Sequence, residues 1–158
     1  MLQLPQVYQL DIEELEHAYQ RAIAACHPDK HHNDPMLKAQ AERMSAGINL
    51  AYDTLVDPLA RAEHLLAVID NNSTYALQTS MDANFLMQQM NWREKIAEAN
   101  QHEKLDLREQ VSEKYAVELD NLARCFDQNW QVDEGLMQQI LQLIGRANYW
   151  RKLQKQLM

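Results

Sequence analysis

The chain has 158 residues, of which 46% are hydrophobic and 24% are charged, and this composition is typical of a soluble globular protein rather than a disordered one. Its net charge of -8 argues against binding to nucleic acid through a basic face, and no run of about 18 apolar residues predicts a membrane span. The two cysteines lie far apart and the N-terminus lacks a signal-peptide pattern, so we expect a cytoplasmic protein.

The first predicted helix covers residues 11–26. Its apolar residues recur every three or four positions, and Asp11 is placed to cap its first turn. Pro28 lacks an amide hydrogen and disfavours helical dihedrals at His27, so this helix should end at Cys26 or His27.

Two further helices are predicted in the first seventy residues, each beginning at an Asp-Pro pair. Asp34-Pro35 begins a long helix whose apolar stripe consists of Leu37, Ala41, Met44, Ile48, Tyr52 and Leu55. Asp57-Pro58 begins a shorter helix that continues to Ile69. Residues 1–70 should therefore form a helical hairpin with one added helix.

Residues 71–81 show no helical period and contain turn-forming residues, so we interpret them as a linker. Three helices are predicted after it, over residues 82–100, 103–126 and 132–157. Their short connections favour an antiparallel three-helix bundle over residues 82–158. With only three glycines and four prolines, the whole chain is predicted to be all-α.

The segment "HPDKHHND", His27 to Asp34, joins the first two predicted helices and is rich in groups that bind metals. Its competent ligands, together with the preceding cysteine, are Cys26, His27, Asp29, His31 and His32. Pro28 breaks the helix that an i, i+4 histidine pair would need, and no second cluster completes a four-ligand site. No resident metal or cofactor is expected, and a metal-dependent enzyme remains the alternative.

The same segment could also be catalytic through a cysteine and a histidine, or could serve only as a contact. Cys26 lies on the apolar stripe at the negative end of a helix dipole, which disfavours a thiolate nucleophile. Asp29, on a turn stiffened by Pro28 at the tip of a hairpin, is well placed to accept a partner's arginine. We therefore interpret the segment as a docking tip.

These residues resemble a known family. A helix followed by "HPDK" and by a long helix ending in "INLAYDTLVDPLARAEHLL" resembles the J domain of co-chaperones that stimulate ATP hydrolysis by DnaK-class chaperones. "YQLD" before the hairpin and "FLMQQMNWREKI" at residues 85–96 are similar to the HscB family of iron-sulfur cluster assembly. The resemblance implies a non-enzymatic adaptor that stimulates the chaperone HscA and delivers the scaffold protein IscU to it.

The resemblance also implies two sets of contact residues. The chaperone-binding set is His27, Pro28 and Asp29, aided by Lys30 and Arg21. The scaffold-binding set is Leu86, Met87, Met90, Arg93 and Glu94, with Tyr149 as a distal aromatic contact.

The pattern of residues 85–99 supports part of the scaffold-binding set. Phe85, Trp92, Ile96 and Ala99 form one stripe suited to the bundle core, whereas three apolar residues, Leu86, Met87 and Met90, lie largely off it. Methionine and leucine on an outer face make an adaptable recognition surface. In the alternative interpretation, Leu86 and Met90 pack against the first module or complete the bundle.

The sequence departs from the family at three places. It lacks the longer aromatic first helix, which suggests either a missing wall of the J-domain core or a start further upstream. Few basic residues precede "HPDK", and Asn91 stands where relatives carry an acid, so both partner contacts could be weaker. A J-domain protein with a different client is a further alternative.

Overall fold

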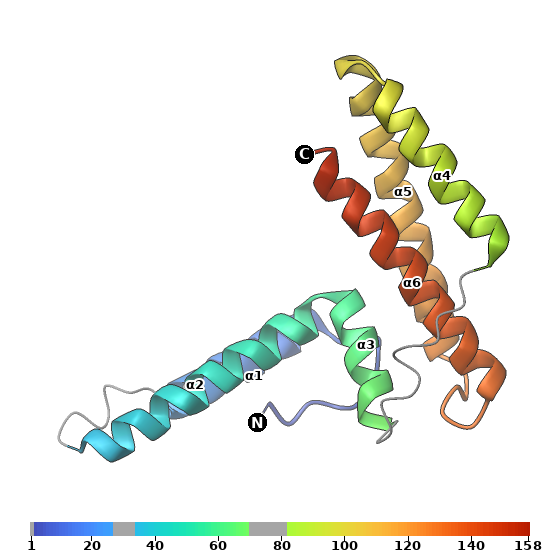
Figure 1. Cartoon of the computed structure of the whole chain (residues 1–158). Coiled ribbons are helices and arrows are strands. Elements are labelled where there is room, and N and C mark those ends of the chain that lie inside the picture. The colour runs from blue at the N-terminus through green and yellow to red at the C-terminus, as the bar shows by residue number, and fades with distance from the viewer. Residues whose placement is uncertain (1, 27–33, 70–81) are drawn as a thin grey trace. The chain divides into compact units, whose positions relative to one another are not determined.

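The computed structural model describes residues 2–26, 34–69 and 82–158. Within these ranges the chain forms helices and no strands, and it divides into two compact units, Met1–Leu65 and Leu66–Met158 (Figure 1). The predicted all-α class is thereby confirmed. The linker predicted at residues 71–81 lies outside the described residues.

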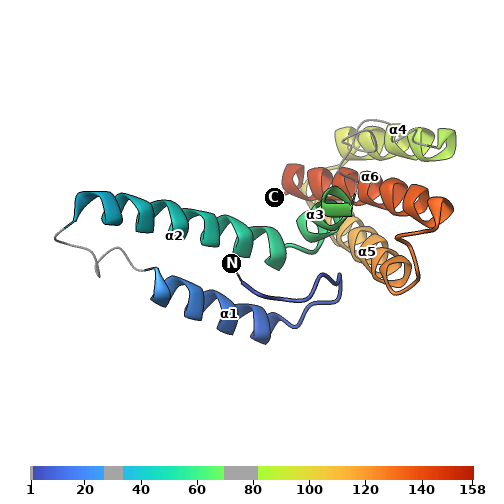
Figure 2. The ribbon, with the colours of Figure 1, turned by 90° about the horizontal axis from the view of Figure 1, so that it is seen from below.

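The first unit is built on a hairpin of two helices, α1 (Ile12–Ala25) and α2 (Pro35–Val56). The predicted caps are present, since Asp11 accepts hydrogen bonds from the amides of Glu13 and Glu14, and Asp34 caps α2 in the same way. Figure 2 shows the two helices side by side. Their shared core has four buried members, Leu2, Leu15, Ala18 and Ile48.

Polar contacts fix the register between α1 and α2. The Tyr52 hydroxyl donates to Glu16 Oε2 at 2.7 Å, and the ring of Tyr52 lies 4.4 Å, centroid to centroid, from that of Tyr19. Near the other end of the hairpin, the Ser45 hydroxyl donates to the carbonyl oxygen of Cys26 at 3.2 Å. The helices are therefore antiparallel, and α1 ends beside Ser45.

The N-terminal segment contributes to this unit without forming a helix. Leu2 and Tyr8 are buried, and the Arg61 guanidinium carbon lies 5.3 Å from the centre of the Tyr8 ring. Arg61 belongs to α3 (Pro58–Ile69) and donates to the Leu55 carbonyl at 3.0 Å. A segment without helical structure therefore supplies two buried side chains to this unit.

The second unit contains the predicted three-helix bundle, formed by α4 (Ala83–Glu98), α5 (Gln101–Phe126) and α6 (Glu134–Gln156). Aromatic rings pack edge to face in its core, with Trp150 5.4 Å from Trp92 and 5.9 Å from Phe85 between centroids. The remaining buried members of this core cluster are Leu107, Val111, Tyr149 and Leu153.

Three helix boundaries of the bundle differ from the prediction by two residues. α4 ends at Glu98 rather than Asn100. α5 begins at Gln101 rather than Glu103, because Asn100 is the N-cap and Glu103 completes a capping box by accepting from the Asn100 amide at 2.7 Å. α6 begins at Glu134 rather than Val132, because Asp133 caps it by accepting from the Leu136 amide.

Candidate functional site

The predicted chaperone contact lies at the tip of the α1–α2 hairpin. His27, Pro28, Asp29 and Lys30 fall outside the described residues, as do His31 and His32. The residues that flank this segment are described: Cys26 ends α1, and Asp34 caps α2. Hydrogen bonds therefore fix the two helix ends that flank this segment in the sequence.

The exposed face of α1 carries little positive charge. Arg21 is exposed, as predicted for a steering residue, but Glu13, Glu14 and His17 are exposed on the same helix. Glu16 is engaged within the hairpin, and hydrogen bonds from Gln20 and Tyr52 lower its pKa. α1 alone therefore offers weak electrostatic steering toward an acidic partner.

The predicted scaffold-binding residues of α4 are on its surface. Leu86, Met87 and Met90 are 47%, 65% and 62% exposed, and the predicted core residues Phe85 and Trp92 are buried. The alternative in which Leu86 and Met90 complete the bundle core is therefore wrong. Arg93 and Glu94 are exposed on the same helix, beside the apolar side chains.

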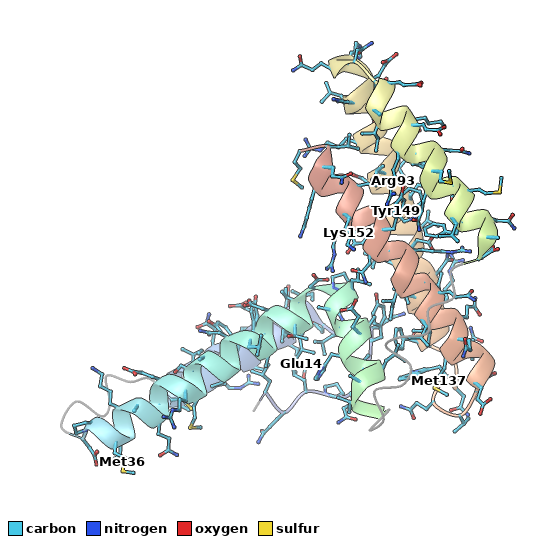
Figure 3. All side chains as sticks on the ribbon, viewed as in Figure 1. Glu14, Met36, Arg93, Met137, Tyr149 and Lys152 are labelled. Atoms are coloured by element: carbon cyan, nitrogen blue, oxygen red, sulfur yellow. The ribbon has the colours of Figure 1, made fainter. Side chains whose placement is uncertain are left out.

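Tyr149 lies in the core rather than on the surface. It is only 8% exposed, its ring packs edge to face on Phe85, and its hydroxyl donates to the Gln89 carbonyl of α4 at 3.0 Å. Burial raises its pKa, which the nearby Arg93 lowers in part. Figure 3 shows Arg93, Tyr149 and Lys152 gathered where α4 meets α6. Tyr149 therefore supports α4 from beneath, and its role as a distal scaffold contact stays a prediction.

Two depressions on the bundle share Gln88 and Arg146, and together we call them the groove. Residues of α4 line most of the first, and residues of α5 line most of the second. The Arg146 guanidinium carbon lies 5.2 Å from the centre of the Phe85 ring. Asn91, where relatives carry an acid, lines one depression. Sequence reasoning did not anticipate this groove.

Glu118 is the unusual residue of the groove. Burial raises the pKa of its carboxyl group, and the charges of Arg146 and Lys114 offset this only in part. Neither Glu118 Oε2 nor Trp150 Nε1 has a hydrogen-bond partner among the described residues. The ionised carboxylate is therefore poorly compensated.

We expect Glu118→Gln to stabilise the bundle at neutral pH. With a raised pKa, the carboxyl binds its proton more tightly in the folded than in the unfolded chain, so its ionisation reduces stability as the pH rises past its ordinary value of 4.5. Because Glu118 is partly exposed, solvent screens the effect, and the gain should not exceed about 1 kcal/mol, roughly 4–8 °C in the melting temperature of a bundle of this size.

Thermal melting at several pH values measures this gain. The difference between Glu118→Gln and wild type should disappear below about pH 4, where both states are protonated. Glu109→Gln, at an exposed position of α5, is the matched control and should melt like wild type. A Glu118→Gln variant that melts below wild type at pH 7 would show that the carboxylate stabilises the bundle.

Two family models divide the chain between them. A DnaJ domain model matches residues 1–64, and a model described as the HSCB C-terminal oligomerisation domain matches residues 81–158. The co-chaperone protein HscB homolog of Shewanella baltica is 31% identical over 145 residues, which cover 91% of this chain and 76% of that protein. The chain belongs to the HscB family of co-chaperones.

Solved structures of HscB proteins have the same fold. The crystal structure of the human co-chaperone HscB superimposes with a TM-score of 0.85 at 24% identity, covering 99% of this chain and 77% of that chain. Chaperone HscB from Vibrio cholerae gives 0.69 at 26% identity, covering 99% and 96%. The first curated HscB relatives are matched over 60% to 76% of their own length.

Membership of the HscB family defines the class of function. The chain joins a J domain to the HscB C-terminal domain and is a co-chaperone that acts in iron-sulfur cluster assembly. Its J domain implies a DnaK-class chaperone as partner. Within residues 2–26, 34–69 and 82–158, no helix combines the length and the apolar character that crossing a bilayer requires.

The metal-site alternative rests on residues of the hairpin tip. Among the residues that the structure describes, no three His, Cys, Asp or Glu side chains lie close enough together to hold a metal ion. The predicted ligands other than Cys26 lie outside those residues.

Cys125 is buried, and burial raises the pKa of its thiol, which disfavours a nucleophilic role.

Proposed function

We propose that this co-chaperone stimulates ATP hydrolysis by a DnaK-class chaperone of the HscA type and delivers an iron-sulfur scaffold protein of the IscU type to it. The proposal places this work in the cytoplasm and assigns no bond-making chemistry to the chain. The observation that carries it is the apolar surface of α4, because Leu86, Met87 and Met90 are exposed on a bundle whose core is already filled.

The chaperone contact is assigned to the hairpin tip. Asp29 follows Pro28, whose ring restricts the backbone, so ordering Asp29 should cost little entropy on binding. Its carboxylate accepts a bidentate pair of hydrogen bonds from a chaperone arginine. This pair shifts the chaperone toward its hydrolysis-competent state, because it forms only in that state.

The scaffold contact is assigned to the exposed face of α4. Two methionines and a leucine adapt their shape to an apolar partner, and Arg93 and Glu94 beside them orient it. Tyr149 acts beneath this face, where its hydrogen bond to the Gln89 carbonyl holds the turn that precedes Met90. It is a positioning residue for the contact surface.

Joining the two contacts in one chain explains the adaptor role. A scaffold protein bound to α4 is confined near any chaperone bound to the hairpin, so its effective concentration at the chaperone rises. The two contacts should therefore be separable by mutation, each variant losing one partner and retaining the other.

Steady-state ATP hydrolysis tests the proposal. The purified chain should increase the turnover of a DnaK-class ATPase and should show no turnover by itself. A titration with the scaffold protein should show binding to the chain without the chaperone. Stimulation without scaffold binding would indicate a J-domain protein with a different client, and absence of stimulation would overturn the proposal.

We expect Leu86→Ala combined with Met90→Ala to weaken scaffold binding by about ten- to a hundredfold, because central apolar contacts each contribute roughly 1 kcal/mol or more. Stimulation of the chaperone alone should be unchanged. Isothermal titration with the scaffold protein measures the affinity. Leu105→Ala, at a residue of α5 that is 63% exposed, is the control and should bind like wild type. Equal affinity of the double variant and wild type would place the contact elsewhere.

A further inference from the structure

Arg146 of α6 is a half-buried cation whose hydrogen-bond donors are not used within the bundle. Its guanidinium carbon lies 5.2 Å from the centre of the Phe85 ring, so the charge is placed over an aromatic face. Among the described residues, none forms a hydrogen bond or an ion pair with the Arg146 side chain. A guanidinium presents its N–H donors in a planar fork, and here the fork is left for a partner.

The carboxylates that share the groove with Arg146 do not neutralise it. The charge of Arg146 lowers the pKa of Glu118, but the two side chains form no ion pair and burial outweighs the attraction. Asp82 lines the first depression and caps α4, where the positive end of the helix dipole balances its charge. Glu113 is exposed in the second depression, which also contains the opposite charge of Lys114. Arg146 therefore keeps positive charge to offer at the first depression.

Neutral amide side chains line much of the first depression. Its volume is about 430 Å³, and Asn84, Gln88 and Asn91 of α4 line it together with Arg146. Each of these amides has an NH2 group that can donate hydrogen bonds. A guanidinium accompanied by neutral donors fits a carboxylate, whose two oxygens accept several hydrogen bonds at once. A cationic group in the same place would be repelled by Arg146.

The first depression adjoins the apolar surface that we assign to the scaffold protein. Met87, which is 65% exposed, belongs to both. At about 100° per residue, Asn84, Gln88 and Asn91 lie on the side of Met87 that is opposite to Leu86. The depression therefore continues the exposed face of α4 without a break. A protein that covers Met87 comes within reach of Arg146.

We propose that the first depression is a carboxylate site of the scaffold contact, in which Arg146 pairs with an acidic side chain of the scaffold protein. This inference rests on the proposed function, because it extends the contact made by Leu86, Met87 and Met90. The two parts of the contact have different effects. The apolar side chains contribute affinity at any ionic strength, whereas the charged pair contributes affinity that salt reduces and favours a partner with an acid at this place.

Isothermal titration with the scaffold protein at low and at high ionic strength tests the inference. Arg146→Met keeps an unbranched side chain that can pack on Phe85 but removes the charge. It should weaken binding about tenfold at low ionic strength, as the loss of a hydrogen bond to a charged group does, and by less at high ionic strength. Arg146→Lys, which keeps the charge but not the fork, should give an intermediate loss. Thermal melting shows that both variants are folded.

The matched control is Arg108→Met. Arg108 is exposed on α5 and lines neither depression, so this variant removes the same charge from the same bundle at a place outside the proposed site. It should change the affinity less than about twofold, as surface substitutions outside a contact do. An equal loss for Arg108→Met would show that the net charge of the bundle decides the affinity, and would overturn the inference.

Other results would also decide against it. If Arg146→Met binds the scaffold protein as tightly as wild type at low ionic strength, or more tightly, the inference is overturned and the proposed function stays intact. A loss that is equal for Arg146→Met and Arg146→Lys and independent of salt would show that Arg146 acts only through packing. A wild-type chain that binds no scaffold protein overturns the proposed function and the inference together.

Discussion

Asp29→Asn is expected to reduce stimulation of the chaperone's ATP hydrolysis to the background rate while folding and scaffold binding are retained. The amide keeps the size of the carboxylate but loses the charge and one of the two acceptor oxygens that a bidentate arginine pair requires. The loss should be at least tenfold, because a hydrogen bond to a charged group contributes roughly 1.5–3 kcal/mol. Steady-state hydrolysis at saturating co-chaperone measures it.

Asp34→Asn is the matched control for this prediction. It removes the same charge from the end of the same segment, but asparagine retains the cap of α2, in which the side chain accepts from the amides of Met36 and Leu37. This variant should stimulate the chaperone nearly as well as wild type. If Asp29→Asn stimulates like Asp34→Asn, the docking role of the Asp29 carboxylate is wrong.

Trp150→Ala is expected to unfold the bundle under conditions where wild type is folded. Trp150 is 1% exposed, and its ring packs edge to face against Phe85, Trp92 and Tyr149. Truncation of a fully buried tryptophan costs about 3–5 kcal/mol, which is comparable to the whole stability of a small domain. Scaffold binding should be lost with the fold.

Chemical denaturation followed by circular dichroism measures this effect. Trp150→Phe fills part of the same space and should lose less than Trp150→Ala, whereas Leu105→Ala, at an exposed position of α5, should remain within about 0.5 kcal/mol of wild type. A Trp150→Ala bundle with the denaturation midpoint of wild type would contradict the assignment of Trp150 to the centre of the core.

The helix starts of the first unit could be predicted from the sequence because their signals are local. Asp11, Asp34 and Asp57 each accept hydrogen bonds from amides two and three residues further on, a geometry that depends only on neighbouring residues. The predicted start of α5 at Glu103 is two residues late, because Glu103 is not the first helical residue but completes the capping box with Asn100.

Burial was harder to predict because it depends on contacts between distant residues. The exposure of Leu86, Met87 and Met90 followed from their position off the core stripe, but the burial of Tyr149 depends on its packing beneath α4. The spacing of residues also indicates that Glu118 is partly buried. Glu118 lies three residues after Tyr115 and four before Leu122, so all three share one face of α5.

The burial of Leu2 and Tyr8 has no periodic signal at all. These residues belong to a segment of the first unit that has no helical structure, and no regular spacing of apolar residues predicts its packing. The chaperone-binding residues at positions 27–30 were recognised from their identity and their place between two capped helices, and they stay a prediction because they lie outside the described residues.

The adaptor role is tested most directly by combining two defective variants. One is Asp29→Asn, which should bind only the scaffold protein, and the other is Leu86→Ala with Met90→Ala, which should contact only the chaperone. The quantity to measure is the increase in the chaperone's ATP hydrolysis rate when the scaffold protein is added. Wild type should give the full increase. An equal mixture of the variants should give none, because neither chain brings both partners together. Stimulation by the mixture that equals wild type would contradict the account, since the two contacts would then act without being joined in one chain.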